Sequence, residues 1–373
     1  MQKLLLFLVF LAFFQICFGQ DIVNEKAFIQ YYEGAIAGKY PISMRLVNWA
    51  NGSLVGDYQY KKVGKNITLY GEFTDKNIFE LSEYAGDEMT GKFRGQFVSE
   101  IAIKGTWSNP QGTKSLLFEL KAVKKAENTS GWAGSWHLND VWDGGTLLIG
   151  SVTKDSLEFA ISVVRSAHMG EIWGTAARSG NKAVFKKVEF ALENEVKPEP
   201  CHLIFELKGD HILVDQESSA MACGFGMRAY ANGKYENKVR EVKPTLSFGP
   251  ETNRVFPNQA LHDGFKKLVG SEIYELFAFN MQGYDRVEQS PQDGFSATAV
   301  QGAVYGLYMN NEAIIMFDKS GKYWAAAIDF ENNDPIVRYY TNSEKHKTQL
   351  PATIDQWRER FPQYPVRFES KQE

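Results

Sequence analysis

The sequence has few cysteines, few prolines and little excess of either charge. Only three of its 373 residues are cysteine and 12 are proline, whereas 32 are glycine and 14% are aromatic. Its 41 Lys and Arg residues nearly balance 45 Asp and Glu residues, and without a long basic run this gives no electrostatic support for nucleic-acid binding. The composition also excludes a disordered chain, a collagen-like chain and a coiled coil. Aromatic and glycine enrichment with little proline favours β-structure with many turns.

The one long apolar run stands at the N-terminus. A short basic start is followed by the apolar stretch Leu4–Ile16 and then by Cys17-Phe18-Gly19, which offers small residues for cleavage before Gln20. This pattern predicts a signal peptide over residues 1–19. The alternatives are a membrane anchor, for which the run falls short of the roughly 20 residues of a span, and a lipoprotein acylated at Cys17. We expect an exported protein, periplasmic or extracellular, with no transmembrane segment.

Loss of this segment would leave two cysteines, Cys201 and Cys223. An even pair in an exported chain favours a disulfide. Such a bond would close a loop of about 20 residues and contribute roughly 3 kcal/mol in the chain-entropy model. The alternatives have less support, because a zinc site needs more ligands at short spacing and a nucleophilic cysteine needs a histidine and a third group nearby. We therefore predict a disulfide and no metal site.

The hydrophobic pattern divides the mature chain into three parts. Residues 20–124 and 131–239 each show about eight short alternating segments between turns, at the 8–12-residue spacing of a sandwich or barrel. Eight antiparallel strands also close a small barrel that holds side chains or one small ligand. Residues 242–373 combine helical and strand patterns, which is typical of an α+β domain. We predict a mainly β protein with two tandem antiparallel barrel-like (lipocalin-like) domains followed by an α+β domain.

The individual elements are expected at turn-bounded apolar segments. In the first part the expected strands are Ile29–Ala37, Ile42–Trp49, Leu54–Lys61, Ile67–Phe73, Ile78–Tyr84, Met89–Val98, Ile101–Trp107 and Leu116–Lys121. In the second part they are Gly145–Ile149, Leu157–Val164, Gly170–Ala176, Lys182–Phe190, His202–Leu207, Ile212–Asp215 and Gly226–Tyr235, after a start near Gly131–Trp136. In the last part we expect helices over Pro257–Val269 and Leu350–Phe361, strands over Ala299–Tyr308, Glu312–Phe317, Tyr323–Phe330 and Ile336–Tyr340, and either state over Ile273–Phe279.

The sequence carries no strong catalytic signature. It has neither a His-Glu-x-x-His zinc motif nor a Gly-x-Ser-x-Gly nucleophile elbow. His168 and Glu171 form the most suggestive cluster, although residues three apart on a regular strand face opposite sides. No spacing singles out a pair of carboxylates for glycoside cleavage among Asp140, Asp143, Glu171 and Glu206. We therefore predict a protein without catalytic residues or cofactors, with an unrecognised hydrolase as an alternative.

Two aromatic stretches are candidate binding sites. Trp132, Trp136, Trp142 and Trp173 gather in the second part beside Asp and Asn residues, which would suit stacking on a small molecule or a glycan, with core packing as the alternative. The stretch 301–308 places two glycines among two tyrosines, and an exposed tyrosine is a good interface anchor. The binding residues that we predict are Gln301, Tyr305, Tyr308, Trp136 and Trp142.

The last third of the chain resembles the bacterial exported inhibitors of vertebrate-type lysozyme. The likeness rests on Phe265–Gly270, Gly302–Gly306, Ala313–Phe317 and Trp324–Ala327. In that family a loop between two cysteines, carrying a lysine and a histidine, plugs the active-site cleft of the enzyme; the matching stretch 301–308 has none of these residue types. The first two parts resemble uncharacterised β-repeats of exported bacterial proteins. The resemblance implies a non-catalytic binding or inhibitory protein that acts on an extracellular protein such as a muramidase, with a small-molecule or glycan binder as the alternative.

Overall fold

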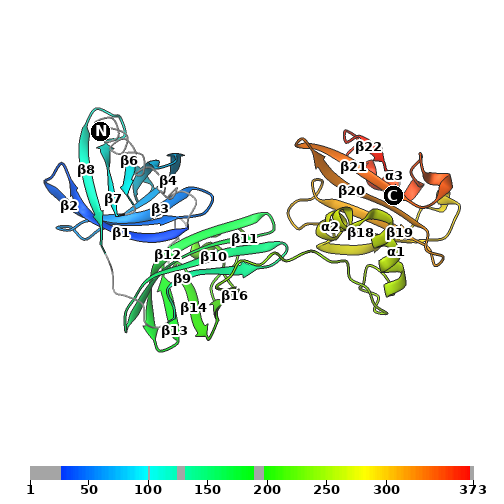
Figure 1. The fold of residues 1–373 in the computed structure, drawn as a ribbon, viewed down its shortest axis with the longest axis horizontal. Helices are drawn as coiled ribbons and strands as arrows, with labels where there is room; N and C mark the ends of the chain where they lie inside the picture. Colours follow the sequence, from blue (N-terminus) through cyan, green and yellow to red (C-terminus); the bar gives the residue numbers. More distant parts are fainter. Residues whose placement is uncertain (1–26, 100, 124–130, 189–196, 370–373) are drawn as a thin grey trace, which may run out of the picture.

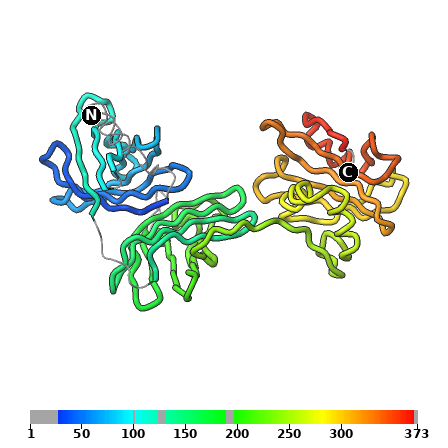
Figure 2. The backbone as a smooth tube through the Cα atoms, in the orientation of Figure 1, coloured from blue at the N-terminus to red at the C-terminus, as the bar shows by residue number. Residues whose placement is uncertain are grey.

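The computed structural model describes residues 27–99, 101–123, 131–188 and 197–369. The predicted signal peptide lies outside these residues. Figures 1 and 2 show two β-barrels, barrel 1 (residues 28–122) and barrel 2 (residues 134–236), and a mixed sheet domain arranged in a row, with barrel 2 in the middle. The predicted mainly β fold, with two antiparallel barrels before an α+β domain, is confirmed.

Barrel 1 is a closed up-and-down barrel in which each strand pairs with the next and β8 returns to β1. The predicted strands of this part are all present, with small shifts at their ends. Inward-facing aromatic and aliphatic side chains fill its interior. Its strands are β1 (Phe28–Ile36), β2 (Tyr40–Asn48), β3 (Ser53–Tyr60), β4 (Asn66–Asp75), β5 (Ile78–Ala85), β6 (Glu88–Ser99), β7 (Ala102–Ser108) and β8 (Ser115–Ala122).

Four glycines let the strands of barrel 1 approach one another closely. They are Gly34, Gly56, Gly71 and Gly105, each beside the backbone of a neighbouring strand. A Cβ at any of them would lie between 1.8 and 2.1 Å from a carbonyl oxygen of that strand. Since no other residue type fits such a position, glycine is required for the curvature that closes this small barrel.

Barrel 2 is closed as well, but the strand pair that closes it is short. Strand β9 pairs with β16 through two register pairs, whereas five pairs join β1 to β8 in barrel 1. The predicted disulfide is confirmed, and it joins Cys201, the first residue of β14, to Cys223 in a short 3-10 helix. The strands are β9 (Gly134–Asn139), β10 (Asp143–Val152), β11 (Ser156–Arg165), β12 (His168–Ser179), β13 (Lys182–Lys187), β14 (Cys201–Lys208), β15 (His211–Gln216) and β16 (Gly233–Glu236).

The predicted strand Gly226–Tyr235 is present only over its last three residues, because pairing starts at Gly233. The residues before it carry buried side chains, among them Ala229 and Ala231, but run irregularly across the core. The side chain of Gln216 receives the backbone N–H of Ala231 at 2.9 Å in place of a strand partner. Apolar residues at alternate positions in this segment are buried, and in the sequence this pattern cannot be distinguished from that of a strand.

The two barrels pack against each other through outward-facing side chains. Val47 and Val55 of barrel 1 form one apolar cluster with Leu148 and Ala160 of barrel 2. At Gly150 a Cβ would lie 2.5 Å from the side chain of Ile29, so the contact requires glycine there.

A polar group joins this apolar contact between the barrels. The carboxylate of Asp57 pairs with Arg45, and it also accepts a hydrogen bond from the indole N–H of Trp173 at 3.1 Å. Burial raises the pKa of Glu171, which lies in the same region, and hydrogen bonds from Trp49 and Ser162 oppose that shift. The barrels thus share both an apolar core and buried polar contacts.

The C-terminal domain is a sheet covered on both faces. Helices α1 and α2 pack on one face around Phe265 and Phe277, and α3 packs on the other around Trp357. Because both faces are buried, the central strands are apolar without alternation. The elements are α1 (Gln259–Val269), α2 (Ser271–Asn280), β17 (Gly283–Val287), β18 (Thr298–Ala303), β19 (Glu312–Phe317), β20 (Tyr323–Glu331), β21 (Asp334–Thr341), α3 (Ala352–Arg358) and β22 (Val366–Phe368).

A buried histidine makes the stability of this domain depend on pH. The Nδ1 of His346 accepts a hydrogen bond from the indole N–H of Trp324 at 3.2 Å, and burial, assisted by Lys345, lowers its pKa. A histidine with a lowered folded-state pKa contributes stability above its unfolded pKa of about 6.5, and that stability is lost as the pH falls. We expect the melting temperature to fall by roughly 2–5 °C between pH 7.5 and 5.

The measurement is thermal unfolding followed by tryptophan fluorescence. His346→Asn should remove most of this pH dependence, whereas His211→Asn, at the start of β15 next to the exposed Asp210, should leave it in place. An unchanged pH dependence in His346→Asn would contradict the assignment.

Candidate functional site

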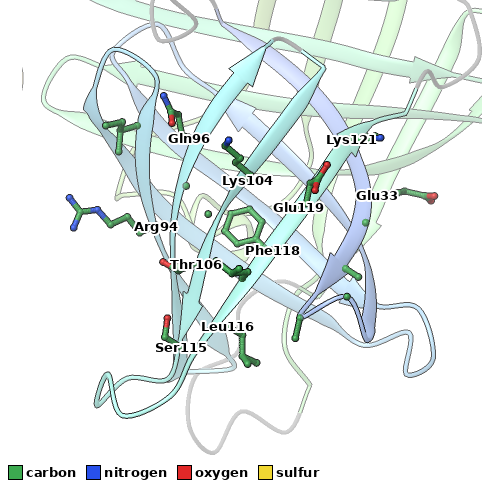
Figure 3. Close-up of a pocket in the computed structure, with 18 residues that line it drawn as sticks. Glu33, Arg94, Gln96, Lys104, Thr106, Ser115, Leu116, Phe118, Glu119 and Lys121 are labelled. Carbon is green, nitrogen blue, oxygen red and sulfur yellow. The ribbon is translucent and has the colours of Figure 1, made fainter.

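Hollows of ligand size occur at several places in the described part of the chain, and three of them differ clearly in chemistry. The largest, about 1060 Å³, lies on the outer wall of barrel 1 over β1, β6, β7 and β8. Figure 3 shows the side chains of Arg94 and Glu33 pointing away from this wall. Its lining includes Gly34, Gly95 and Gly105. It is open, and its charges are of both signs.

The second hollow, about 520 Å³, is at one open end of barrel 1. The turns that follow β1, β3 and β7 meet there, since alternate turns of an up-and-down barrel lie at the same end. We call this site the mouth, and its principal side chains are Lys39, Tyr40, Tyr60, Lys62, Trp107 and Lys114.

A buried carboxylate lies behind the aromatic wall of the mouth. Glu83 is 3% exposed, and its Oε2 accepts hydrogen bonds from the hydroxyl of Tyr58 at 2.6 Å and from the indole of Trp107 at 2.9 Å. Burial raises the pKa of Tyr58, and the bond to Glu83 raises it further, so the hydroxyl stays protonated. A Cβ at Gly91 would lie 2.6 Å from both Glu83 and Trp107, which leaves glycine as the residue that fits.

The third hollow, about 430 Å³, is a cleft between barrel 2 and the C-terminal domain. Its wall holds Arg165, whose Nη1 donates to Asp143 at 3.0 Å and whose Nε donates to the carbonyl of Tyr230 at 2.8 Å. Ser166 of barrel 2 meets Gln282 of the C-terminal domain, with 2.9 Å between Nε2 and Oγ. This hydrogen bond joins barrel 2 directly to the C-terminal domain at the cleft.

The cleft continues into an exposed loop, residues 304–311, between β18 and β19. The exposed fractions of Tyr305, Tyr308 and Met309 are 44%, 59% and 44%. The predicted strand Ala299–Tyr308 ends at Ala303 because the chain turns at Gly306, where φ is 82°. The cation of Arg228 in barrel 2 lies 5.7 Å from the ring centroid of Tyr305.

This loop is held rigidly at both ends. The N–H of Tyr305 donates to Gln282 at 2.9 Å, and the N–H of Met309 donates to Glu312 at 2.8 Å. The hydroxyl of Tyr364 donates to the carbonyl of Met309 at 3.2 Å. Glu312 is 1% exposed and pairs with Arg360. The exposed side chains are thus presented on a preorganised backbone.

The five predicted binding residues do not form one site. Tyr305 and Tyr308 are exposed on the 304–311 loop, and Gln301 lies half-buried in β18. Trp136 is in the core of barrel 2, where its indole donates to the carbonyl of Trp132 at 2.9 Å, so it presents no surface to a ligand. Trp142 is half-buried, and its indole donates to the carbonyl of Phe279 at 2.9 Å across the junction with the C-terminal domain.

The acidic and histidine candidates are dispersed in the same way. His168 lines the cleft, whereas Glu171 hydrogen-bonds to Ser162 and faces the junction with barrel 1. Asp143 pairs with Arg165, and Glu206 pairs with Lys208 at 3.4 Å. Within the part of the chain that is described, these groups do not converge on one point.

Comparison with other proteins adds nothing to this geometry. No protein-family model, curated protein or solved structure matches the chain. Among residues 27–99, 101–123, 131–188 and 197–369, no group of three or more His, Cys, Asp or Glu side chains is placed to hold a metal ion. None of the helices in those ranges has the length and apolar character to cross a membrane.

Proposed function

We propose that this protein is an exported, non-catalytic binding or inhibitory protein that acts by surface complementarity on an extracellular protein, with muramidases as the first class to test. The observation that carries the proposal is the preorganised 304–311 loop with exposed Tyr305, Tyr308 and Met309. A rigid loop loses little conformational entropy when it binds, and this favours affinity.

The residue types around the loop support a protein partner. Tyrosine and arginine dominate binding hot spots, and methionine adapts to irregular apolar surfaces. Exposed Met169, Met227 and Tyr230 of barrel 2 add to the apolar surface near the cleft. The loop, β12 and the irregular segment before β16 therefore offer apolar anchors beside the cation of Arg228.

The chemistry of a muramidase cleft is complementary to these donors. Glycosidases carry a pair of carboxyl groups beside the scissile bond. The hydroxyl of Tyr308 and the guanidinium of Arg228 donate hydrogen bonds to carboxylates, whereas an acidic loop would be repelled. The loop also overlaps the stretch 301–308, which by its place in the chain resembles the plugging loop of the lysozyme inhibitors, although 301–308 lacks the cysteines, lysine and histidine of that loop.

We expect Tyr308→Ala to weaken inhibition of a susceptible muramidase by about 5- to 30-fold. The substitution removes an exposed anchor worth about 1–2 kcal/mol in a typical interface, and it should not affect folding. The measurement is the lytic rate on a bacterial cell-wall suspension against inhibitor concentration. Phe330→Ala is the matched control, because Phe330 is 46% exposed in the same domain and lies outside the loop.

Failure to slow any of a panel of muramidases, together with no complex in gel filtration at micromolar concentration, would overturn the proposal. Equal losses from Tyr308→Ala and Phe330→Ala would place the contact elsewhere.

The glycan alternative on the tryptophan cluster has less support. Trp132 and Trp136 are buried, and Trp142 and Trp173 contact neighbouring units. Glycan binding lost in Trp142→Ala but kept in Tyr308→Ala would favour that alternative over a protein partner.

A further inference from the structure

We propose that the mouth of barrel 1 binds a small organic anion with a flat aromatic body. The mouth and the 304–311 loop lie on different domains. Binding at the mouth therefore does not depend on the proposed function of the loop. It rests on the walls, the charges and the depth of the mouth.

The walls of the mouth are aromatic and apolar. Tyr40, Tyr60 and Trp107 line it together with the apolar side chains Ile36 and Leu116. Tyr40 is 40% exposed, and its ring meets that of Tyr60 edge-on with centroids 6.5 Å apart. Binding pockets for small molecules have this character, with a mainly apolar lining and a few polar groups that orient the ligand.

The rim of the mouth is cationic. Lys39, Lys62 and Lys114 stand on three different turns, and within the described ranges none of them has an ion-pair partner. Their neighbour Lys61 instead pairs with Glu33 at 2.7 Å. Three uncompensated cations around one aromatic hollow favour an anion over a neutral or cationic ligand.

Two of these lysines already lie near aromatic rings. The Nζ of Lys39 is 5.6 Å from the ring centroid of Tyr40, and the Nζ of Lys114 is 5.9 Å from that of Trp107. A bound anion would therefore find cations beside the same rings that contact its flat body. This pairing of charge and stacking surface specifies the ligand class more closely than either feature alone.

Glu83 acts as a positioning residue for the aromatic wall. It fixes the indole of Trp107 through a hydrogen bond of 2.9 Å, and Tyr58 holds the carboxylate from the other side at 2.6 Å. A ring fixed before binding costs less entropy to order than a mobile one. The carboxylate is buried behind the ring, where it does not offer a competing anionic surface.

The depth of the mouth limits the size of the ligand. Below the hollow, Ile36, Tyr58, Phe93 and Phe118 are at most 3% exposed and fill the interior of the barrel. A long alkyl chain therefore has no room to enter. A body of two or three aromatic rings fits a hollow of about 520 Å³.

The test compares two dyes that share their ring system. 8-Anilinonaphthalene-1-sulfonate carries a sulfonate, and N-phenyl-1-naphthylamine lacks it. Each is titrated with the full-length native protein and followed by fluorescence. We expect the anionic dye to bind at least tenfold more tightly, and we expect Lys39→Gln/Lys62→Gln/Lys114→Gln to weaken its binding roughly tenfold with no change for the neutral dye.

A matched variant separates local charge from net charge. Lys92→Gln/Lys104→Gln/Lys121→Gln removes the same charge from exposed positions on the outer wall of barrel 1 and should leave dye affinity within about twofold. Equal effects of the two triple variants, or equal affinity for the two dyes, would overturn the proposal.

A change at the wall of the mouth tests stacking without touching the core. Tyr40→Ser alters an exposed side chain and should weaken the anionic dye several-fold. Tyr308→Ala, on the other domain, should leave dye binding unchanged. If Tyr40→Ser and Lys39→Gln/Lys62→Gln/Lys114→Gln both keep full affinity for the anionic dye, the dye binds elsewhere and the mouth is not the binding site.

Discussion

Removal of the disulfide is expected to lower the free energy of unfolding of barrel 2 by about 3 kcal/mol. Cys201 and Cys223 are 22 residues apart and almost fully buried. Their bond ties the start of β14 to the irregular segment that brings Phe225 into the core. Without it, the unfolded chain gains conformational freedom and that segment loses its anchor.

The measurement is urea unfolding of Cys201→Ala/Cys223→Ala and of the unmodified protein with and without dithiothreitol. The reduced protein and the double variant should unfold at similar, lower urea concentrations. A midpoint that dithiothreitol leaves unchanged would contradict a stabilising role for the bond.

Asp57→Ala is expected to destabilise the junction of the two barrels by roughly 3–5 kcal/mol. The substitution leaves Arg45, whose side chain is 12% exposed, without its carboxylate partner, and it removes the acceptor for the indole of Trp173. An isolated charge in such surroundings costs more than the ion pair itself contributes. Chemical unfolding followed by tryptophan fluorescence measures the loss.

The double substitution Arg45→Met/Asp57→Leu provides the control. It removes both charges and should recover much of the stability lost in Asp57→Ala, because no unpaired charge remains. If Asp57→Ala costs less than about 1 kcal/mol, the pair behaves as a surface salt bridge and the junction does not depend on it.

The sequence predicted the strands of the barrels well because each buries one face. In the C-terminal domain it missed β17 and β22, which are short and lie at the two edges of the sheet. Strand β22 is also the parallel partner of β21, and a parallel contact leaves no turn signal between its strands. Both elements depend on contacts that are distant in the sequence.

The contact between the barrels was not predicted, although the sequence carries a trace of it. The pairs Leu46–Val47, Leu54–Val55 and Leu147–Leu148 interrupt the alternation of apolar and polar residues. One residue of each pair points into a barrel and the other into the junction. Paired apolar residues in an alternating strand therefore indicate a second buried face.

The site could be predicted only in part. The glycines and tyrosines of 301–308 indicated an exposed stretch, but the composition could not tell Trp136, which faces inward, from an exposed tryptophan. The mouth of barrel 1 could have been found from the order of its turns, since Lys39, Lys62 and Lys114 occur at alternate turns of a predicted barrel. The position of Arg228 beside Tyr305 depends on domain packing, for which the sequence carries no local signal.

The short closure of barrel 2 has a mechanical consequence. The C-terminal domain follows directly after β16, which is held to β9 through two register pairs and to β15 through four. Tension on the C-terminal domain, for instance from a bound and anchored partner, would break its contacts with barrel 2 at the cleft and then peel this strand from its neighbours. Barrel 2 would then open strand by strand from β16. Barrel 1, which is farther along the chain from the pulled domain, would stay closed.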